Sequence, residues 1–141
     1  MSWIAPDVHS LQQLLSLNPQ LEAELTAFSV ALWSQPYVPA TTLELCRLRI
    51  ARLLQCRPEL IQRHLEVTAV PEQKRVLLNR YSSDARSSDA QRACLEFTDI
   101  YCQDPAAISD AQAEAVVLHY GDAGLVTLIQ ALGLFNAWAR M

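Results

Sequence analysis

The chain has 141 residues, of which 51% are hydrophobic, and it carries a formal net charge of -4. A chain of this length buries a substantial core, and we expect a single domain over residues 1–141. The acidic balance argues against a nucleic-acid partner, because proteins that bind phosphate backbones concentrate positive charge. With only three glycines and seven prolines, the composition is not that of a disordered chain.

The N-terminal stretch "MSWIAPDVHSLQQLL" has neither a basic region nor a long apolar run. We therefore expect no secretory signal, a cytoplasmic protein and reduced thiols. Its four cysteines, at positions 46, 56, 94 and 102, form no C-x-x-C pair, and no histidine lies at zinc-finger spacing from them. This pattern predicts no metal site, and we expect no cofactor.

Helical periodicity and helix-start signals run along almost the whole chain. Capping-box patterns at Thr41-x-x-Glu44, Ser88-x-x-Gln91 and Ser109-x-x-Gln112 each precede an apolar-periodic run. Alternating β-branched runs and hairpin dipeptides are missing from the sequence, so we expect an all-α fold. The expected helices lie near 8–17, 19–34, 41–55, 58–68, 71–80, 88–103, 109–119 and 122–140.

A short connection around Cys56 joins two of these helices, and Pro58 is suited to the first turn of the second one. Such a short connection predicts an antiparallel helix hairpin. Glu44 lies about ten residues before the turn, and Arg63 and His64 lie seven to eight after it. At a rise of ~1.5 Å per residue these levels nearly match, so Glu44 is expected to face Arg63 or His64.

Cys56 is expected at the N-terminal end of the second helix of the hairpin. There the helix dipole and Arg57 lower a thiol pKa, while Glu59, one turn later, opposes them. Structural roles also account for both glutamates. Glu44 has the third position of the Thr41 capping box and the spacing for an ion pair with Arg47, and Glu59 is favourable near a helix N-terminus.

The last expected helix has no charged residue between Asp122 and Arg140. This uncharged stretch is close to the lower length limit for a membrane span, but Thr127, Gln130 and Asn136 interrupt it. Burial on two sides explains such a helix better, with one side in the subunit core and the other against a neighbouring subunit. We therefore expect no membrane association and a homo-oligomer.

The pattern E-x11-C-x2-[C or E]-x3-H resembles that of the AhpD-like family, which includes alkyl hydroperoxidase D and carboxymuconolactone decarboxylase. "TLELCRLRIARLLQC" is similar to the helix that carries the first half of this pattern. The segment from "SDAQRACLEF" onward resembles the second part of the family, which ends in an Asn-Ala-Trp signature, here residues 136–138. The resemblance covers about residues 20–141.

The resemblance implies an all-helical AhpD-like bundle that assembles into trimers or hexamers, with its site near subunit contacts. In the peroxidase branch one cysteine attacks a hydroperoxide, a second resolves it, and a glutamate–histidine pair relays the proton. By resemblance, Glu44 matches the relay glutamate and Cys56 the resolving cysteine. Glu59 stands in place of the attacking cysteine and Arg63 in place of the histidine, while His64 is displaced by one position.

These departures change the expected chemistry. A carboxylate cannot attack a peroxide to form a sulfenic acid, and an arginine cannot relay a proton at physiological pH. The main expectation is therefore an AhpD-like protein with an altered site that lacks two-cysteine peroxidase activity. A first alternative is a thiol-dependent, peroxiredoxin-type hydroperoxide reductase with an antioxidant role, which uses Cys56 alone.

A second alternative is a cofactor-free lyase similar to carboxymuconolactone decarboxylase, acting on a small organic acid. Glu44, Glu59 or His64 would then serve as the general acid–base. One of three arginines would hold the carboxylate of the substrate. These are Arg47, Arg57 and Arg63.

Overall fold

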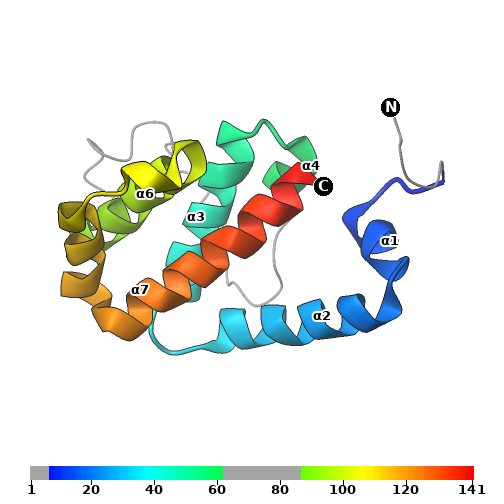
Figure 1. Ribbon diagram of the computed structural model, residues 1–141, viewed down its shortest axis with the longest axis horizontal. Coiled ribbons are helices and arrows are strands. Elements are labelled where there is room, and N and C mark those ends of the chain that lie inside the picture. Colours follow the sequence, from blue (N-terminus) through cyan, green and yellow to red (C-terminus); the bar gives the residue numbers. More distant parts are fainter. Residues whose placement is uncertain (1–6, 62–86) are drawn as a thin grey trace.

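The computed structural model describes residues 7–61 and 87–141, and over these residues the chain is helical, with no strand (Figure 1). The all-α prediction is therefore confirmed for this part of the chain. The elements are α1 (Leu11–Ser16), α2 (Pro19–Ser34), α3 (Ala40–Leu53), α4 (Arg57–Ile61), α6 (Asp89–Gln103), the short 3-10 helix η2 (Pro105–Ala107) and α7 (Asp110–Arg140).

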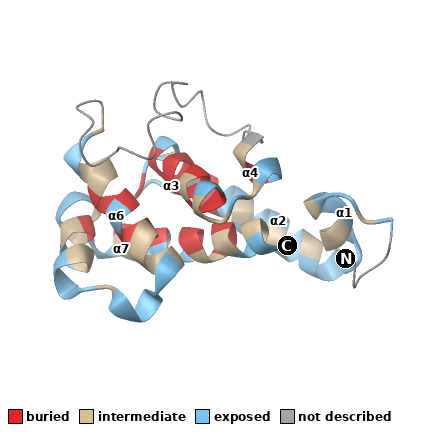
Figure 2. Cartoon of the chain, turned by 90° about the horizontal axis from the view of Figure 1, so that it is seen from above, coloured by how far each residue is buried: buried red, intermediate tan, exposed pale blue. Residues whose placement is uncertain are grey.

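The core is built where α3, α6 and α7 pack against one another, and α3 is the helix that is most completely buried (Figure 2). α3 is buried on nearly all sides, and its core side chains include Leu43, Leu48 and Ile50. Phe97 of α6 and Phe135 of α7 complete this cluster. Full burial of each such side chain stabilises the fold by about 1.5–3 kcal/mol, so these three helices form a rigid base for the site.

α1 and α2 form an arm that is joined to this core by the C-terminal end of α2 (Figure 1). In α2 only Leu32 and Trp33 are buried, and the Trp33 ring stacks on Phe135 with centroids 5.4 Å apart. The side chain of Asn18 caps the start of α2 by accepting a backbone hydrogen bond. The arm thus inserts Leu32 and Trp33 into the core and leaves most of its other side chains beside it.

Two of the three predicted capping boxes are confirmed. Ser88 and Ser109 each cap a helix, with both reciprocal bonds present. The prediction for Thr41 was wrong, because α3 begins at Ala40 with Pro39 as its N-cap and has no side-chain cap. The proline ring fixes φ, here -55°, and the backbone carbonyl of Pro39 accepts the first helical bonds, so Thr41 lies inside the first turn.

The two helices expected at 109–119 and 122–140 form one element, α7, which kinks at Gly121. Gly121 has φ 72° and ψ 179°, a conformation that side-chain-bearing residues rarely adopt. The expected helix at 71–80 and the end of the one at 58–68 lie outside the described residues.

α7 is, among the described helices, the one long and apolar enough by length and composition to cross a membrane. A core helix of a soluble protein passes the same test. Leu128, Leu132 and Phe135 on one side of α7 are part of the core formed with α3 and α6.

Candidate functional site

The site begins at the turn between α3 and α4. Gln55 has a positive φ of 54°, which reverses the chain after α3, and the backbone N–H of Cys56 donates to the carbonyl of Ala51 at 2.8 Å. α4 begins at Arg57, so Cys56 lies immediately before a helix, as expected from the sequence, and it is half-buried. This turn sets α4 against α3 and brings Glu59 next to the buried face of α3.

Arg47 joins the two glutamates of the site. Its Nε and Nη2 donate to the two carboxylate oxygens of Glu44 at 2.9 and 2.5 Å. Its Nη1 donates to Glu59 Oε2 at 2.9 Å and to the backbone carbonyl of Glu59 at 2.6 Å. The side chains of Arg47, Glu44 and Glu59 are only 1%, 3% and 7% exposed. We call these three residues the Glu44–Arg47–Glu59 network.

The network has a formal charge of -1, from one guanidinium and two carboxylates, and it lies among buried apolar side chains. Burial lowers the pKa of Arg47, but its hydrogen bonds and charge attraction to Glu44 and Glu59 outweigh this, so the net pKa is raised. Arg47 therefore stays cationic. The fork-shaped contact with Glu44 and the two bonds to Glu59 offset the cost of burying the charges.

Glu44 and Glu59, both singled out from the sequence, thus come together, and Arg47 is the residue that connects them. The sequence predicted Arg47 as a helical neighbour of Glu44, but it did not predict the contact of Arg47 with Glu59 across the turn. A signal was present, since Glu44 and Arg47 are three residues apart and share one face of the helix. Arg63 and His64, expected opposite Glu44, lie outside the described residues.

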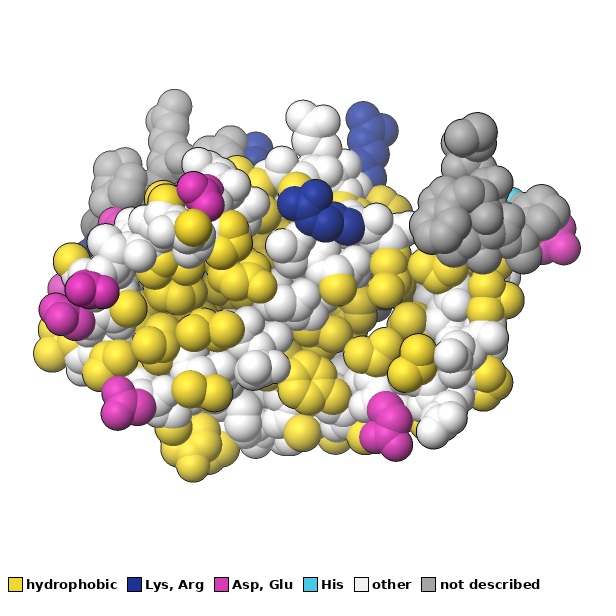
Figure 3. All heavy atoms as spheres, viewed as in Figure 1, with side chains coloured by type: hydrophobic (Ala, Val, Ile, Leu, Met, Phe, Trp, Pro, Cys, Tyr) yellow, Lys and Arg dark blue, Asp and Glu magenta, His cyan; other side chains and the backbone are white. Residues whose placement is uncertain are grey.

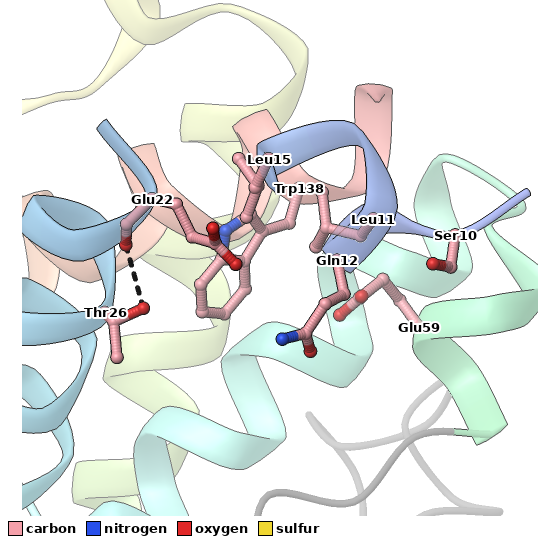
Figure 4. A pocket seen from close by; sticks show the side chains of 8 residues that line it. All are labelled: Ser10, Leu11, Gln12, Leu15, Glu22, Thr26, Glu59 and Trp138. Carbon is pink, nitrogen blue, oxygen red and sulfur yellow. Dashed lines mark hydrogen bonds between the residues drawn. The ribbon is translucent and has the colours of Figure 1, made fainter. Parts of the chain in front are cut away.

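A cavity of about 270 Å³ lies beside Glu59, between α1, α2, α4 and the C-terminal end of α7 (Figure 4). Its polar lining includes the carboxylates of Glu22 and Glu59 and the amide of Gln12. The indole of Trp138 and the side chain of Leu15 contribute apolar surface. The arm of α1 and α2 thus supplies a large part of the cavity wall. The sequence did not indicate that this arm lies beside Glu59.

The four cysteines differ in burial. Burial raises the pKa of Cys46 to about 12, and it also raises that of Cys94 well above its usual range. The pKa of Cys102 is raised too, mainly by burial. A thiol with a raised pKa forms little thiolate at neutral pH, which leaves these three as weak nucleophiles. Cys56 and Cys102 are both half-buried, and Cys56 is distinguished by its position immediately before α4.

A metal centre is not indicated by the described residues, which contain no group of three or more histidine, cysteine, aspartate or glutamate side chains arranged to hold an ion. The chemistry that the described site offers is therefore that of a buried carboxylate held by a guanidinium, with a half-buried thiol one helical turn away.

Comparison with known proteins finds a structural relative. No protein-family model matches the sequence, and no curated protein matches it. The crystal structure of a protein of unknown function from Agrobacterium tumefaciens, described as a candidate antioxidant defence protein AhpD, has a TM-score of 0.75 to this chain. The match covers 90% of this chain and 88% of that one, at 19% sequence identity. The chain therefore has the fold of this AhpD-like protein, as the resemblance of its sequence to that family predicted.

Proposed function

We propose that the chain is an AhpD-like family protein in which Glu59, held in a buried carboxylate–guanidinium network, replaces the attacking cysteine of the redox pair, and that it lacks two-cysteine peroxidase activity. The observation that carries this proposal is the double contact of Arg47 with Glu59, at 2.9 Å to the carboxylate and 2.6 Å to the backbone carbonyl. By resemblance, position 59 is where a peroxidase of this family has its attacking thiol.

The chemistry of the two-cysteine cycle explains why this exchange matters. An attacking thiolate takes one peroxide oxygen, breaks the O–O bond and releases an alcohol, which leaves a sulfenic acid. A resolving thiol then forms a disulfide and releases water. Glu59 has no sulfur to oxidise, and its carboxylate is bound by Arg47. Of the two motif positions, only Cys56 could take part.

Binding of a small ligand is the role that fits this geometry. Glu59 is nine-tenths buried and also lines the cavity of about 270 Å³. A fixed carboxylate at the wall of an otherwise partly apolar cavity is the usual arrangement for orienting a small molecule. We infer that the site serves ligand recognition in a cytoplasmic protein.

Self-association is the other part of the proposal, as a homotrimer or hexamer. Its support is apolar surface: Val126 and Ile129 of α7 and Phe28 and Val30 of α2 are exposed. Hydrophobic side chains gather over the face seen in Figure 3, on which α2 and α7 lie. Contiguous apolar surface of this kind usually marks an interface.

A one-cysteine peroxidase is the second candidate function. The position of Cys56, immediately before the first residue of α4, supports it. In this cycle Cys56 would be oxidised to a sulfenic acid, and an external thiol would reduce it. For the alternative of a lyase acting on an organic acid, Arg47 is already bound by two carboxylates, so Arg57 or Arg63 would have to hold the substrate.

The test is consumption of cumene hydroperoxide with dithiothreitol as reductant, comparing wild type with Cys56→Ser and with Cys102→Ser as a matched cysteine control. We expect no turnover above the uncatalysed rate in any of the three proteins. Turnover that is lost only in Cys56→Ser would establish the one-cysteine enzyme instead. Turnover that both substitutions abolish would point to a disulfide cycle and would contradict the proposal.

A further inference from the structure

We propose that the cavity beside Glu59 binds a small organic cation, namely a primary ammonium group on a short alkyl chain. This inference deepens the proposed function, since it rests on the cavity being a ligand site and names the chemical class of the ligand.

The charge of the lining favours a cation. Two of the described lining residues, Glu22 and Glu59, are acidic, and none of them is basic. Arg47 lies behind Glu59, but its charge is shared with Glu44, so the Glu44–Arg47–Glu59 network still carries a formal charge of -1. A carboxylate ligand would face like charges here, whereas an ammonium group would be attracted from two sides.

The apolar part of the lining favours an organic cation over a bare metal ion. Trp138, Leu11 and Leu15 offer carbon surface for an alkyl chain, and the face of an indole attracts a cation placed over it. In Figure 4 the side chains of Gln12 and Trp138 lie between those of Glu22 and Glu59. A cation entering this space would meet the aromatic ring and the carboxylates together.

Hydrogen-bond acceptors fit a primary ammonium group, which has three N–H donors and no acceptor. The two carboxylates and the amide oxygen of Gln12 provide acceptors on different walls of the cavity. The hydroxyl of Thr26 donates to the backbone carbonyl of Glu22 at 2.8 Å, so its oxygen remains suited to accept a bond. The site therefore offers more acceptors than donors.

The experiment is isothermal titration calorimetry of the full chain with three probes of matched length: pentylammonium, pentanol and pentanoate. We expect pentylammonium to bind at least tenfold more tightly than either of the others. Glu22→Gln should weaken pentylammonium binding at least fivefold. Glu24→Gln removes the same charge from an exposed position on α2 that does not line the cavity, and it should change the affinity less than twofold.

Pentanol or pentanoate binding as tightly as pentylammonium would overturn the inference, and so would equal effects of the two glutamate substitutions. Glu22 is half-buried and outside the Glu44–Arg47–Glu59 network, so its substitution leaves the core contacts in place. Different experimental results would contradict the proposed function and the proposed ligand class. Disulfide-based hydroperoxide turnover would contradict the proposed function whatever the cavity binds, while a missing preference for the cation removes only the ligand class.

Discussion

Arg47 is fully enclosed by the fold, and its guanidinium is the only cationic group of the Glu44–Arg47–Glu59 network. Two carboxylates in a protein core are tolerated when a charge of opposite sign is held between them with good hydrogen-bond geometry. Replacing such a group with an apolar one leaves both carboxylates buried without compensation. Arg47 thus explains how the carboxylate of Glu44 is accommodated in the protein core.

Cys46 gives a prediction about alkaline pH. Its pKa is raised to about 12 in the fold by burial, whereas an exposed thiol in the unfolded chain has a pKa of about 8.5. A group with a raised folded pKa contributes stability that is complete below the unfolded pKa and is lost as the pH rises toward the folded pKa. Between pH 7 and 10, the wild type should lose about 1–2 kcal/mol more stability than Cys46→Ala.

Urea unfolding of both proteins at pH 7 and pH 10 measures this difference. The ionisation of all other groups is shared by the two chains, so the difference between their losses isolates Cys46. Equal losses would show that the Cys46 thiol is not held in its protonated form by burial.

The sequence singled out individual residues of the candidate site, but it did not predict the contact between Arg47 and Glu59. Glu44, Cys56 and Glu59 stand out from spacing and resemblance alone, and the structure brings both glutamates to one site. The role of Arg47 was missed because its contact with Glu59 crosses the turn, and only the chain reversal at Gln55 creates it. Helical spacing reports neighbours on the same helix and carries no information about a partner on the next one.

α7 shows how a single residue shapes an element. The helix changes direction at Gly121, whose φ of 72° and ψ of 179° suit glycine and few other residues. The sequence predicted a break near this position, between helices ending at 119 and beginning at 122. The sequence did not predict that the two helices would be separated by Gly121 alone and would form one kinked helix.

Gly121→Ala should destabilise the protein by about 1–3 kcal/mol, because alanine is strained at this φ and ψ. An added Cβ would have no heavy atom within 4 Å outside its immediate chain neighbours, so the effect reports backbone strain rather than a clash. Gly133→Ala on the same element is the matched control. There the added Cβ makes an ordinary contact at 3.5 Å with Tyr101, and helix propensity should stabilise the protein by about 0.5–1 kcal/mol.

Thermal unfolding of the wild type and the two variants measures these changes. The melting temperature should fall in Gly121→Ala and rise in Gly133→Ala. If Gly121→Ala were as stable as the wild type, the kink would not require a glycine.

Helix starts illustrate the same limit of local sequence. The capping boxes at Ser88 and Ser109 were predicted correctly because the bonds involved join residues only three positions apart. Thr41 satisfied the same pattern, but Pro39 started the helix before it. Here the proline, which fixes its own φ, set the start of the helix in place of the threonine cap.

Residues 7–61 and 87–141 form a core of α3, α6 and α7 and an arm of α1 and α2 that leaves apolar side chains exposed (Figure 1). The all-α class and the AhpD-like fold followed from periodicity and resemblance. The cavity did not, because its walls come from the two ends of the chain and from α4, which only the folded arrangement brings together. No local pattern connects Glu22 with Trp138.

Light scattering coupled to size-exclusion chromatography should give a mass three or six times the 15.8 kDa of one chain. A double variant, Val126→Glu with Ile129→Glu, should shift the mass toward that of one chain, because it places charges on the exposed apolar side of α7. Ala111→Glu adds a charge at an exposed position near the start of the same helix, beyond the Gly121 kink from Val126, and should leave the assembly intact. A wild-type mass of 15.8 kDa would contradict the proposed assembly.

The contact between Arg47 and Glu59 is the feature on which the site and its proposed role depend. A double-mutant cycle with Arg47→Met and Glu59→Met, measured by urea unfolding, tests it most directly. Residues that share a buried ion pair are coupled, and we predict an interaction energy of about 2 kcal/mol, with the double variant much less destabilised than the two single losses combined. Additive losses, within about 0.5 kcal/mol, would show that Arg47 does not hold Glu59 and would contradict the account.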